Sequence, residues 1–114
     1  MVTIIGRKDD MVITGGENVW PEAVEAVLLT HPAVADAGVA GVDDAEWGQR
    51  VVAWVVPAHP NDAPTLEQLR AHVGRTLPGF MAPREVVLVD ELPRTALGKL
   101  RRGLLAPGGR RTEQ

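Results

Sequence analysis

The sequence predicts an α+β domain in which a short hairpin and a three-stranded sheet are packed with helices. Two segments repeat apolar residues at helical spacing, and three segments are apolar runs of strand length. The two kinds of segment alternate along a chain of 114 residues, which is the length of one small domain with one modest core. We find no internal repeat and no low-complexity segment.

The chain opens with two short β-branched runs, at residues 2–5 and 11–14, around the turn sequence Gly-Arg-Lys-Asp-Asp. They predict a small hairpin or a hinge-like opening. The glycine pair of "ITGGEN", Gly15 and Gly16, follows, and its simplest interpretation is a turn from strand to helix. Glycine also allows another molecule to approach the backbone closely.

End signals delimit the two predicted helices. The first begins at Pro21, ends before Pro32 and carries an apolar stripe. The second begins with a capping box formed by Thr65 and Gln68 and ends at Pro78. The inward positions are Val24, Val27 and Leu28 in the first helix, and Leu66, Leu69, Val73 and Leu77 in the second.

Three strands are predicted for the sheet. Residues 34–42 and 51–57 flank the acidic loop 43–50 and should pair antiparallel, with 51–56 at the centre of the sheet. Residues 86–89 supply the third strand, and residues 98–105 are expected to form a last short helical turn.

Composition excludes several classes of function. The chain has 45% hydrophobic residues, a net charge of −3 and no cysteine, which excludes disulfides, cysteine-ligated zinc and thiol catalysis. The three histidines are scattered, so no metal site is expected. No apolar run reaches the roughly 18 residues of a membrane span. The first residues have no signal-peptide pattern, so we predict a cytoplasmic location.

The charge is uneven along the chain. Residues 1–83 carry 5 basic and 11 acidic side chains, whereas residues 84–114 carry 7 and 4. The basic end suits an anion, although a solvated surface is the simpler interpretation for its last residues. Within it, "PRTALGKLRR" places Lys99 after a glycine, and Arg101 and Arg102 strengthen the positive field. Lys99 lacks the glycine and the Ser or Thr of a phosphate-binding P-loop, but a protonated ammonium on a flexible loop can follow a moving charge.

Other candidate residues are ambiguous when taken alone. Asp9 and Asp10 are adjacent in an extended segment and point in opposite directions, so they are not a catalytic carboxylate pair. Trp47 lies in the polar loop, and Phe80 follows Pro78-Gly79. Such aromatic rings are either part of a small core cluster or stacking platforms, and their spacing in the sequence does not distinguish between these two roles.

The segments "GRKDDMVITGGENVWPEAVEAVL" and "LPRTALGKLRR" together resemble the two signature motifs of the C-terminal domain of adenylate-forming enzymes. This superfamily contains acyl-CoA synthetases, adenylation domains of non-ribosomal peptide synthetases and firefly luciferase. The resemblance implies that residues 1–106 are a C-terminal lid domain and that 107–114 are a flexible tail. It also implies that the large N-terminal domain is missing, so the chain is expected to be an excised domain or a truncated product.

The resemblance implies a role for each matching residue. Lys99 matches the lysine that contacts the carboxylate substrate and the phosphate-ribose region during adenylation. Arg7 matches an arginine near the nucleotide and the interdomain contact, and Asp9 matches the hinge about which the domain rotates. Rotation would withdraw Lys99 and bring Gly15 and Gly16 to the pantetheine arm of coenzyme A.

By the same resemblance, Trp47 and Phe80 fall where acyl-CoA synthetases present groups to the coenzyme A nucleotide, with Arg84 as a phosphate partner. Ring stacking and arginine–phosphate pairing are general devices that suit this role. Some relatives carry a second basic residue where this chain has Ala82. The nucleotide end of coenzyme A is therefore expected to be held differently or more weakly here.

The expected function is that of the lid of an ATP-dependent acyl-CoA ligase of the fatty acyl-, aryl- or o-succinylbenzoate-CoA type, inactive without its N-terminal domain. Its expected partners are that domain, coenzyme A and a small carboxylic acid, with no nucleic acid and no membrane span. ATP and AMP are the expected nucleotides, with Mg²⁺ bound mainly by the N-terminal domain. The alternatives are the lid of a peptide-synthetase adenylation domain, which would deliver to a carrier protein, and a non-catalytic binding module. The residues that choose the acid lie elsewhere.

Overall fold

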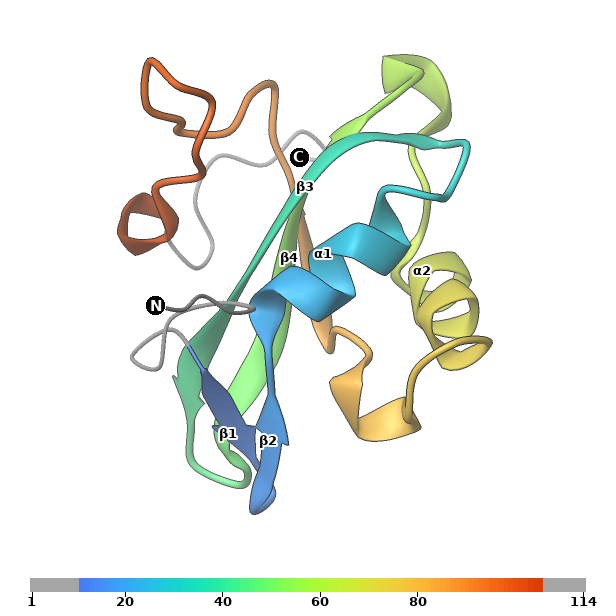
Figure 1. Ribbon diagram of the computed structural model, residues 1–114. Coiled ribbons are helices and arrows are strands. Elements are labelled where there is room, and N and C mark those ends of the chain that lie inside the picture. The colour runs from blue at the N-terminus through green and yellow to red at the C-terminus, as the bar shows by residue number, and fades with distance from the viewer. Residues whose placement is uncertain (1–10, 106–114) are drawn as a thin grey trace.

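The computed structural model describes residues 11–105, in which helices and strands alternate as the sequence predicts (Figure 1). The α+β class is confirmed. The elements in chain order are β1 (Val12–Thr14), β2 (Glu17–Val19), α1 (Pro21–Leu28), β3 (Val34–Asp44), β4 (Gly48–Pro57), the 3₁₀ turn η2 (Pro60–Asp62), α2 (Leu66–Gly74), η3 (Gly79–Met81), β5 (Glu85–Leu88) and η4 (Arg102–Leu104).

Strand β1 confirms the predicted strand at 11–14, but its partner within the described residues is β2, which was not predicted. The two pair antiparallel with Val12 opposite Val19. The interpretation of "ITGGEN" as a turn from strand to helix was therefore wrong. Gly15 and Gly16 form the two-residue loop of a hairpin, with φ angles of 57° and 85°, because the turns that join tightly twisted strands need positive φ. The strand expected at residues 2–5 lies outside the described residues.

Both predicted helices are present. Helix α1 starts at Pro21 and buries Pro21, Val24 and Leu28. The capping box of α2 is confirmed, because the Gln68 N–H donates to Thr65 Oγ1 at 3.1 Å and the Thr65 N–H donates to Gln68 Oε1 at 2.9 Å. The helix ends at Gly74, before the predicted Pro78, since the Leu77 N–H bonds to the Val73 carbonyl in a closing turn.

The larger sheet has the strand order β3-β4-β5, so the prediction that residues 51–56 are central is confirmed. Strands β3 and β4 pair antiparallel, as expected. Strands β4 and β5 pair parallel, with Val52 opposite Glu85, and the connection between them contains α2. A parallel pair requires such a crossover because the chain must return to the end of the sheet where β4 began.

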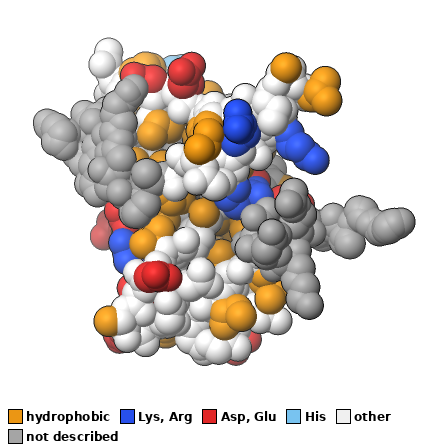
Figure 2. Space-filling model, turned by 90° about the vertical axis from the view of Figure 1, so that its left-hand side faces the viewer, with side chains coloured by type: hydrophobic (Ala, Val, Ile, Leu, Met, Phe, Trp, Pro, Cys, Tyr) orange, Lys and Arg blue, Asp and Glu red, His pale blue; other side chains and the backbone are white. Residues whose placement is uncertain are grey.

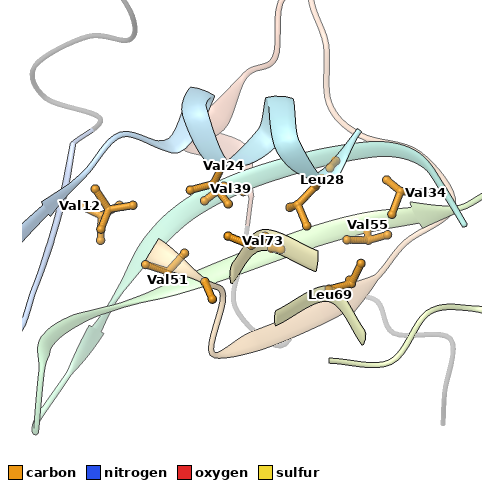
Figure 3. Close-up of a cluster of buried hydrophobic side chains, with 13 residues drawn as sticks. Val12, Val24, Leu28, Val34, Val39, Val51, Val55, Leu69 and Val73 are labelled. Carbon is orange, nitrogen blue, oxygen red and sulfur yellow. The ribbon is translucent and has the colours of Figure 1, made fainter. Parts of the chain in front are cut away.

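Both faces of this sheet are covered, and β4 contributes to each in alternation. Val51, Ala53 and Val55 join the cluster under α1 and α2, together with Leu28, Leu69 and Val73 (Figure 3). Val52 and Trp54 point to the opposite face, where Val87, Val89, Leu92, Leu100 and Leu105 pack. The segment that follows β5 therefore takes the place of a helix on that face, and in Figure 1 it lies across the sheet from α1.

The expected helical turn at 98–105 is only partly confirmed. Residues 102–104 form η4, but Arg94 and Leu100 are bridged antiparallel, so residues 94–100 make a tight hairpin instead. Gly98 has a φ of 89°, and this left-handed conformation is incompatible with continuing a right-handed helix. Within the described part of the chain, no helix has the length and apolar character needed to cross a membrane.

Candidate functional site

The hairpin at residues 94–100, called the lysine hairpin below, holds the backbone of Lys99 from both sides. The Lys99 N–H donates to Thr95 Oγ1 at 3.1 Å, and the Thr95 N–H donates to the Lys99 carbonyl at 2.8 Å. The Gly98 N–H closes the turn by donating to the Thr95 carbonyl at 2.8 Å. The side chain of Lys99 is exposed, and its ammonium pairs with no residue among 11–105. A fixed backbone thus carries a cation that has no partner among the described residues 11–105.

Arg94 ties the lysine hairpin to β3. Its Nε donates to Asp36 Oδ2 at 3.1 Å and its Nη2 donates to Asp36 Oδ1 at 2.7 Å, while Nη1 donates to the Gly98 carbonyl at 2.9 Å. The hydrogen bonds that Arg94 donates to Asp36 are the main cause that raises the pKa of Arg94. One guanidinium therefore bonds to the sheet and to the peptide group that precedes Lys99.

Apolar packing anchors the same segment directly behind Lys99. A Cβ added to Gly38 of β3 would lie 3.1 Å from Leu100 Cδ2 and 3.4 Å from Leu105 Cδ1. Both leucines therefore rest on the bare backbone of β3. Since Leu100 follows Lys99 directly, the side chain of Lys99 leaves the opposite side of the strand from Leu100 and points away from the sheet.

A largely buried ion pair, with side-chain exposures of 11% and 13%, holds the end of the segment. Arg102 Nη2 donates to Glu25 Oε2 at 2.7 Å, and Arg102 Nε donates to the Val39 carbonyl at 2.8 Å. The same carboxylate oxygen accepts the Val39 N–H at 2.8 Å. Burial raises the pKa of Glu25, and the hydrogen bonds from Arg102 and Val39 oppose that rise. The pair joins α1, β3 and η4 in one network.

Hydrophobic side chains stand beside the cations of this segment. Leu97 at the tip of the lysine hairpin is 97% exposed, and Leu104 is 59% exposed. Figure 2 looks onto the side of the molecule where this segment lies and shows Lys and Arg side chains beside hydrophobic ones. An apolar tip next to an exposed lysine suits insertion into another surface better than exposure to water.

A second group of candidate residues surrounds Trp47 in the turn between β3 and β4. Asp44 Oδ1 accepts the N–H of Trp47 at 2.9 Å and that of Glu46 at 2.8 Å, and the bond from Trp47 is the main cause that lowers the pKa of Asp44. The Gly15 N–H donates to the Trp47 carbonyl at 2.9 Å. The β1–β2 hairpin is therefore docked on the turn that carries the indole.

The structure brings three of the predicted residues together here. The guanidinium carbon of Arg84 lies 4.0 Å from the centroid of the Trp47 ring, a cation–π contact. A Cβ at Gly15 would come within 2.9 Å of Trp47 Cε3, so the indole also packs against the bare backbone of the glycine turn. We call Gly15, Trp47 and Arg84 the indole cluster. Its half-exposed ring and exposed arginine can offer stacking and charge to an anionic, aromatic ligand.

The remaining candidates near this end are arranged differently. Gly16 has open space above it, with nothing within 4 Å of an added Cβ. Phe80 in η3 is 37% exposed and stacks on no other aromatic ring among residues 11–105. Ala82 is only 3% exposed and packs in the core, so Arg84 is the cation that this loop offers beside the indole.

The lysine hairpin and the indole cluster lie at opposite ends of the larger sheet (Figure 1). Asp36, which anchors the first, is near the start of β3, and Asp44, which caps the second, is its last residue. They are eight positions apart, or up to about 26 Å along an extended strand. One rigid domain therefore presents two distinct surfaces.

Sequence reasoning missed the residues that hold these surfaces in place. Nothing local in the sequence distinguishes Asp36, Glu25 and Asp44 from other acidic residues, and Arg94 stands out only as part of the motif. No local signal marks Arg102 as inward, because it begins the 3₁₀ turn η4, where the alternation of a strand does not apply. Arg7 and Asp9 lie outside the described residues, so their expected roles stay predictions. Within 11–105, no group of three or more His, Asp or Glu side chains is placed to hold a metal ion.

Comparison with protein families finds a match over residues 23–99 to the model of the AMP-binding enzyme C-terminal domain. A probable 2-succinylbenzoate–CoA ligase of Mycobacterium tuberculosis is 50% identical over 105 residues, which are 92% of this chain and 27% of the relative. A 4-chlorobenzoate–CoA ligase of a Pseudomonas species is 45% identical over 106 residues, 91% of this chain and 20% of the relative.

Among solved structures, o-succinylbenzoate CoA synthetase from Bacillus subtilis, in complex with its acyl-adenylate intermediate, matches with a TM-score of 0.83. The sequence identity is 37%, and the match covers 95% of this chain and 22% of that chain. The chain thus spans between a fifth and about a quarter of the length of these relatives, with coverages of 27%, 20% and 22%.

Proposed function

This chain belongs to the AMP-binding enzyme C-terminal domain family, and from that premise we propose that it is the mobile lid of an ATP-dependent acyl-CoA ligase. In the proposed reaction a carboxylate attacks the α-phosphate of ATP to give an acyl-adenylate and pyrophosphate. Coenzyme A then displaces AMP to give the thioester. The names of the relatives, which are CoA ligases, support this assignment.

The observation that carries the proposal is the separation of the lysine hairpin from the indole cluster. The two lie at opposite ends of one sheet, so a single active centre in the rest of the enzyme can receive only one of them at a time. A reaction in two steps that use different groups matches this arrangement. The domain would present Lys99 for adenylate formation and then rotate to present the indole cluster for thioester formation.

Lys99 is proposed to act in the first step. When the carboxylate attacks the α-phosphate, negative charge develops on the phosphoryl oxygens, and a positioned ammonium stabilises it without donating a proton. The hairpin supplies the required geometry, since the backbone of Lys99 is held by Thr95 while its side chain is exposed. Leu97 beside it would be buried against the N-terminal portion of the enzyme when the lysine is inserted.

The indole cluster is proposed to meet coenzyme A in the second step. Arg84 is aligned by the ring of Trp47 and would pair with a phosphate of the nucleotide, and Phe80 would add a second apolar surface. Gly15 and Gly16 would line the path of the pantetheine arm, where the open space above Gly16 allows close approach to the backbone. With Ala82 buried, a single arginine carries the phosphate contact on this loop.

Three further assignments belong to the proposal. Asp9 is the hinge, Arg7 contacts the nucleotide and the interdomain surface, and Mg²⁺ accompanies ATP in the N-terminal portion. The acid substrate is a carboxylic acid chosen by that portion. The curated relatives make an aromatic acid, with 2-succinylbenzoate first, the substrate to test.

The experiment is a chimera in which this chain replaces the matching C-terminal segment of the M. tuberculosis relative. Adenylate formation is followed by pyrophosphate release, and thioester formation is followed separately from supplied acyl-adenylate and coenzyme A. We expect Lys99→Ala to slow the first step by roughly 10² to 10³ while largely sparing the second. Equal losses in both steps would contradict a lysine that serves one conformation. A folded chimera that acylates only a carrier protein would favour a peptide-synthetase lid, and one with neither activity would favour a binding module.

A further inference from the structure

Gly98, the residue before Lys99, is the position at which the backbone of the lysine hairpin has the most conformational freedom. Its φ of 89° lies in the region that glycine enters freely, and an added Cβ would meet nothing within 4 Å. Neither local sterics nor packing therefore restrains the peptide group between Gly98 and Lys99, so its orientation depends on hydrogen bonds, one of which is the bond from the Lys99 N–H to Thr95 Oγ1 at 3.1 Å. Rotation there would swing the lysine side chain away from any fixed target.

The Arg94 guanidinium restrains the carbonyl side of this peptide group, whose N–H is held by Thr95. Its Nη1 donates to the Gly98 carbonyl, while its Nε and Nη2 both donate to the carboxylate of Asp36 in β3. Asp36 is oriented in turn by accepting the Ala37 N–H at 2.9 Å. The rigid strand thus sets the orientation of the peptide group that carries Lys99.

We propose that Arg94 and Asp36 are positioning residues for adenylate formation, which act only through Lys99. The inference rests on the role proposed above for that lysine. In this role Arg94 and Asp36 would not contact the substrate themselves. They fix the direction in which the lysine side chain leaves the hairpin.

A purely structural role explains these residues less well. The hairpin is already attached to the sheet, because Leu100 packs on Gly38 and Arg102 is bonded to Glu25 directly behind it. The Arg94–Asp36 pair is also partly exposed, with side-chain exposures of 33% and 29%, and pairs of this kind add little stability. What the pair adds is orientation, since a planar guanidinium can hold a carboxylate and a carbonyl in one plane and a lysine cannot.

The test uses Arg94→Lys in the chimeric enzyme, because this variant keeps the charge and loses the planar fork. We expect adenylate formation to fall roughly ten- to a hundredfold, as displacement of a catalytic group by about an ångström does. Thioester formation from supplied acyl-adenylate should stay near the parent rate. In a Lys99→Ala background, Arg94→Lys should cause no further loss, because the arginine then has nothing to position.

Arg50→Lys is the matched control. Arg50 forms a comparable pair with Glu85, from Nε at 3.1 Å and Nη2 at 3.0 Å, with side-chain exposures of 28% and 23%, but it does not touch the lysine hairpin. This variant should leave adenylate formation unchanged. Asp36→Asn weakens the pair from its other side and should also slow adenylate formation. If Arg94→Lys does not fold, this variant tests the positioning role in its place.

The outcomes separate this inference from the proposed function. If Lys99→Ala slows adenylate formation but Arg94→Lys and Asp36→Asn do not, the proposed function stands and the positioning role is refuted. If Arg94→Lys slows both steps equally, the pair acts on stability and the inference fails. It also fails if the double variant with Lys99→Ala forms adenylate more slowly than Lys99→Ala alone, by the factor that Arg94→Lys causes on its own. If Lys99→Ala has no effect on adenylate formation, the lysine role and this inference fall together.

Discussion

Replacing Gly15 with alanine tests whether the glycine turn positions Trp47. The new Cβ would lie 2.9 Å from Cε3 and 3.2 Å from Cζ3 of the indole, whereas carbon atoms in contact are about 3.5–4.0 Å apart. The ring must therefore move by about half an ångström or more. It cannot simply separate from the turn, because the Gly15 N–H is bonded to the Trp47 carbonyl. Overpacking of this kind costs about 1–3 kcal/mol.

Gly16→Ala is the matched control for the conformational part of that cost. Both glycines have positive φ, 57° and 85°, so an alanine is strained at either position by roughly 1–2 kcal/mol. Only the alanine at position 15 meets the indole. The difference between the two variants, about 1–3 kcal/mol in the free energy of unfolding, therefore measures the ring contact. Urea denaturation of the 114-residue chain gives both values.

The same two variants in the chimera connect this contact to function. We expect Gly15→Ala to slow thioester formation more than Gly16→Ala does, because a displaced indole no longer aligns Arg84. Adenylate formation should be similar in both. Equal losses of stability would show that the indole yields without cost, and a thioester rate of Gly15→Ala equal to that of the parent chimera would show that the position of the indole does not matter for coenzyme A.

Other predictions concern the hinge, the glycine path and the buried pair. Asp9→Pro fixes φ near −65° and should abolish one half-reaction of the chimera while sparing the other; an unchanged overall rate would place the hinge elsewhere. Gly16→Leu should leave adenylate formation near normal while thioester formation collapses, and a folded variant with a normal thioester rate would refute the pantetheine path. Arg102→Ala should lower the free energy of unfolding by about 3–5 kcal/mol in urea denaturation, since it leaves Glu25 buried without its ion-pair partner; a loss below about 1 kcal/mol would contradict this. Because burial raises the pKa of Glu25 above 4.5, its contribution to stability is complete below that pH and is lost as the pH rises through the folded pKa. Glu25→Gln should remove this slope from the pH dependence of urea stability, and an identical slope would argue against the raised pKa.

Local features of the sequence were enough to predict most of the elements. The capping box of Thr65 and Gln68 depends on residues three apart, and the apolar run that became β4 marks a strand buried on both faces. The hairpin at Gly15 escaped prediction because a glycine pair suits both a hairpin loop and a turn into a helix. Strand β2, Glu17–Val19, is too short and too polar for alternation to identify it.

The sequence by itself determined the helices, the central strand and the motif lysine, because each of these depends on residues that are close to one another along the chain. Only the tertiary structure decided which distant groups meet. Arg94 reaches Asp36 across 58 positions, and Arg102 reaches Glu25 across 77. Such contacts depend on which strands become neighbours and in what register, which no local periodicity specifies. The separation of Lys99 from the cluster around Trp47 has the same origin, since the length and direction of β3 place them at opposite ends of one rigid sheet.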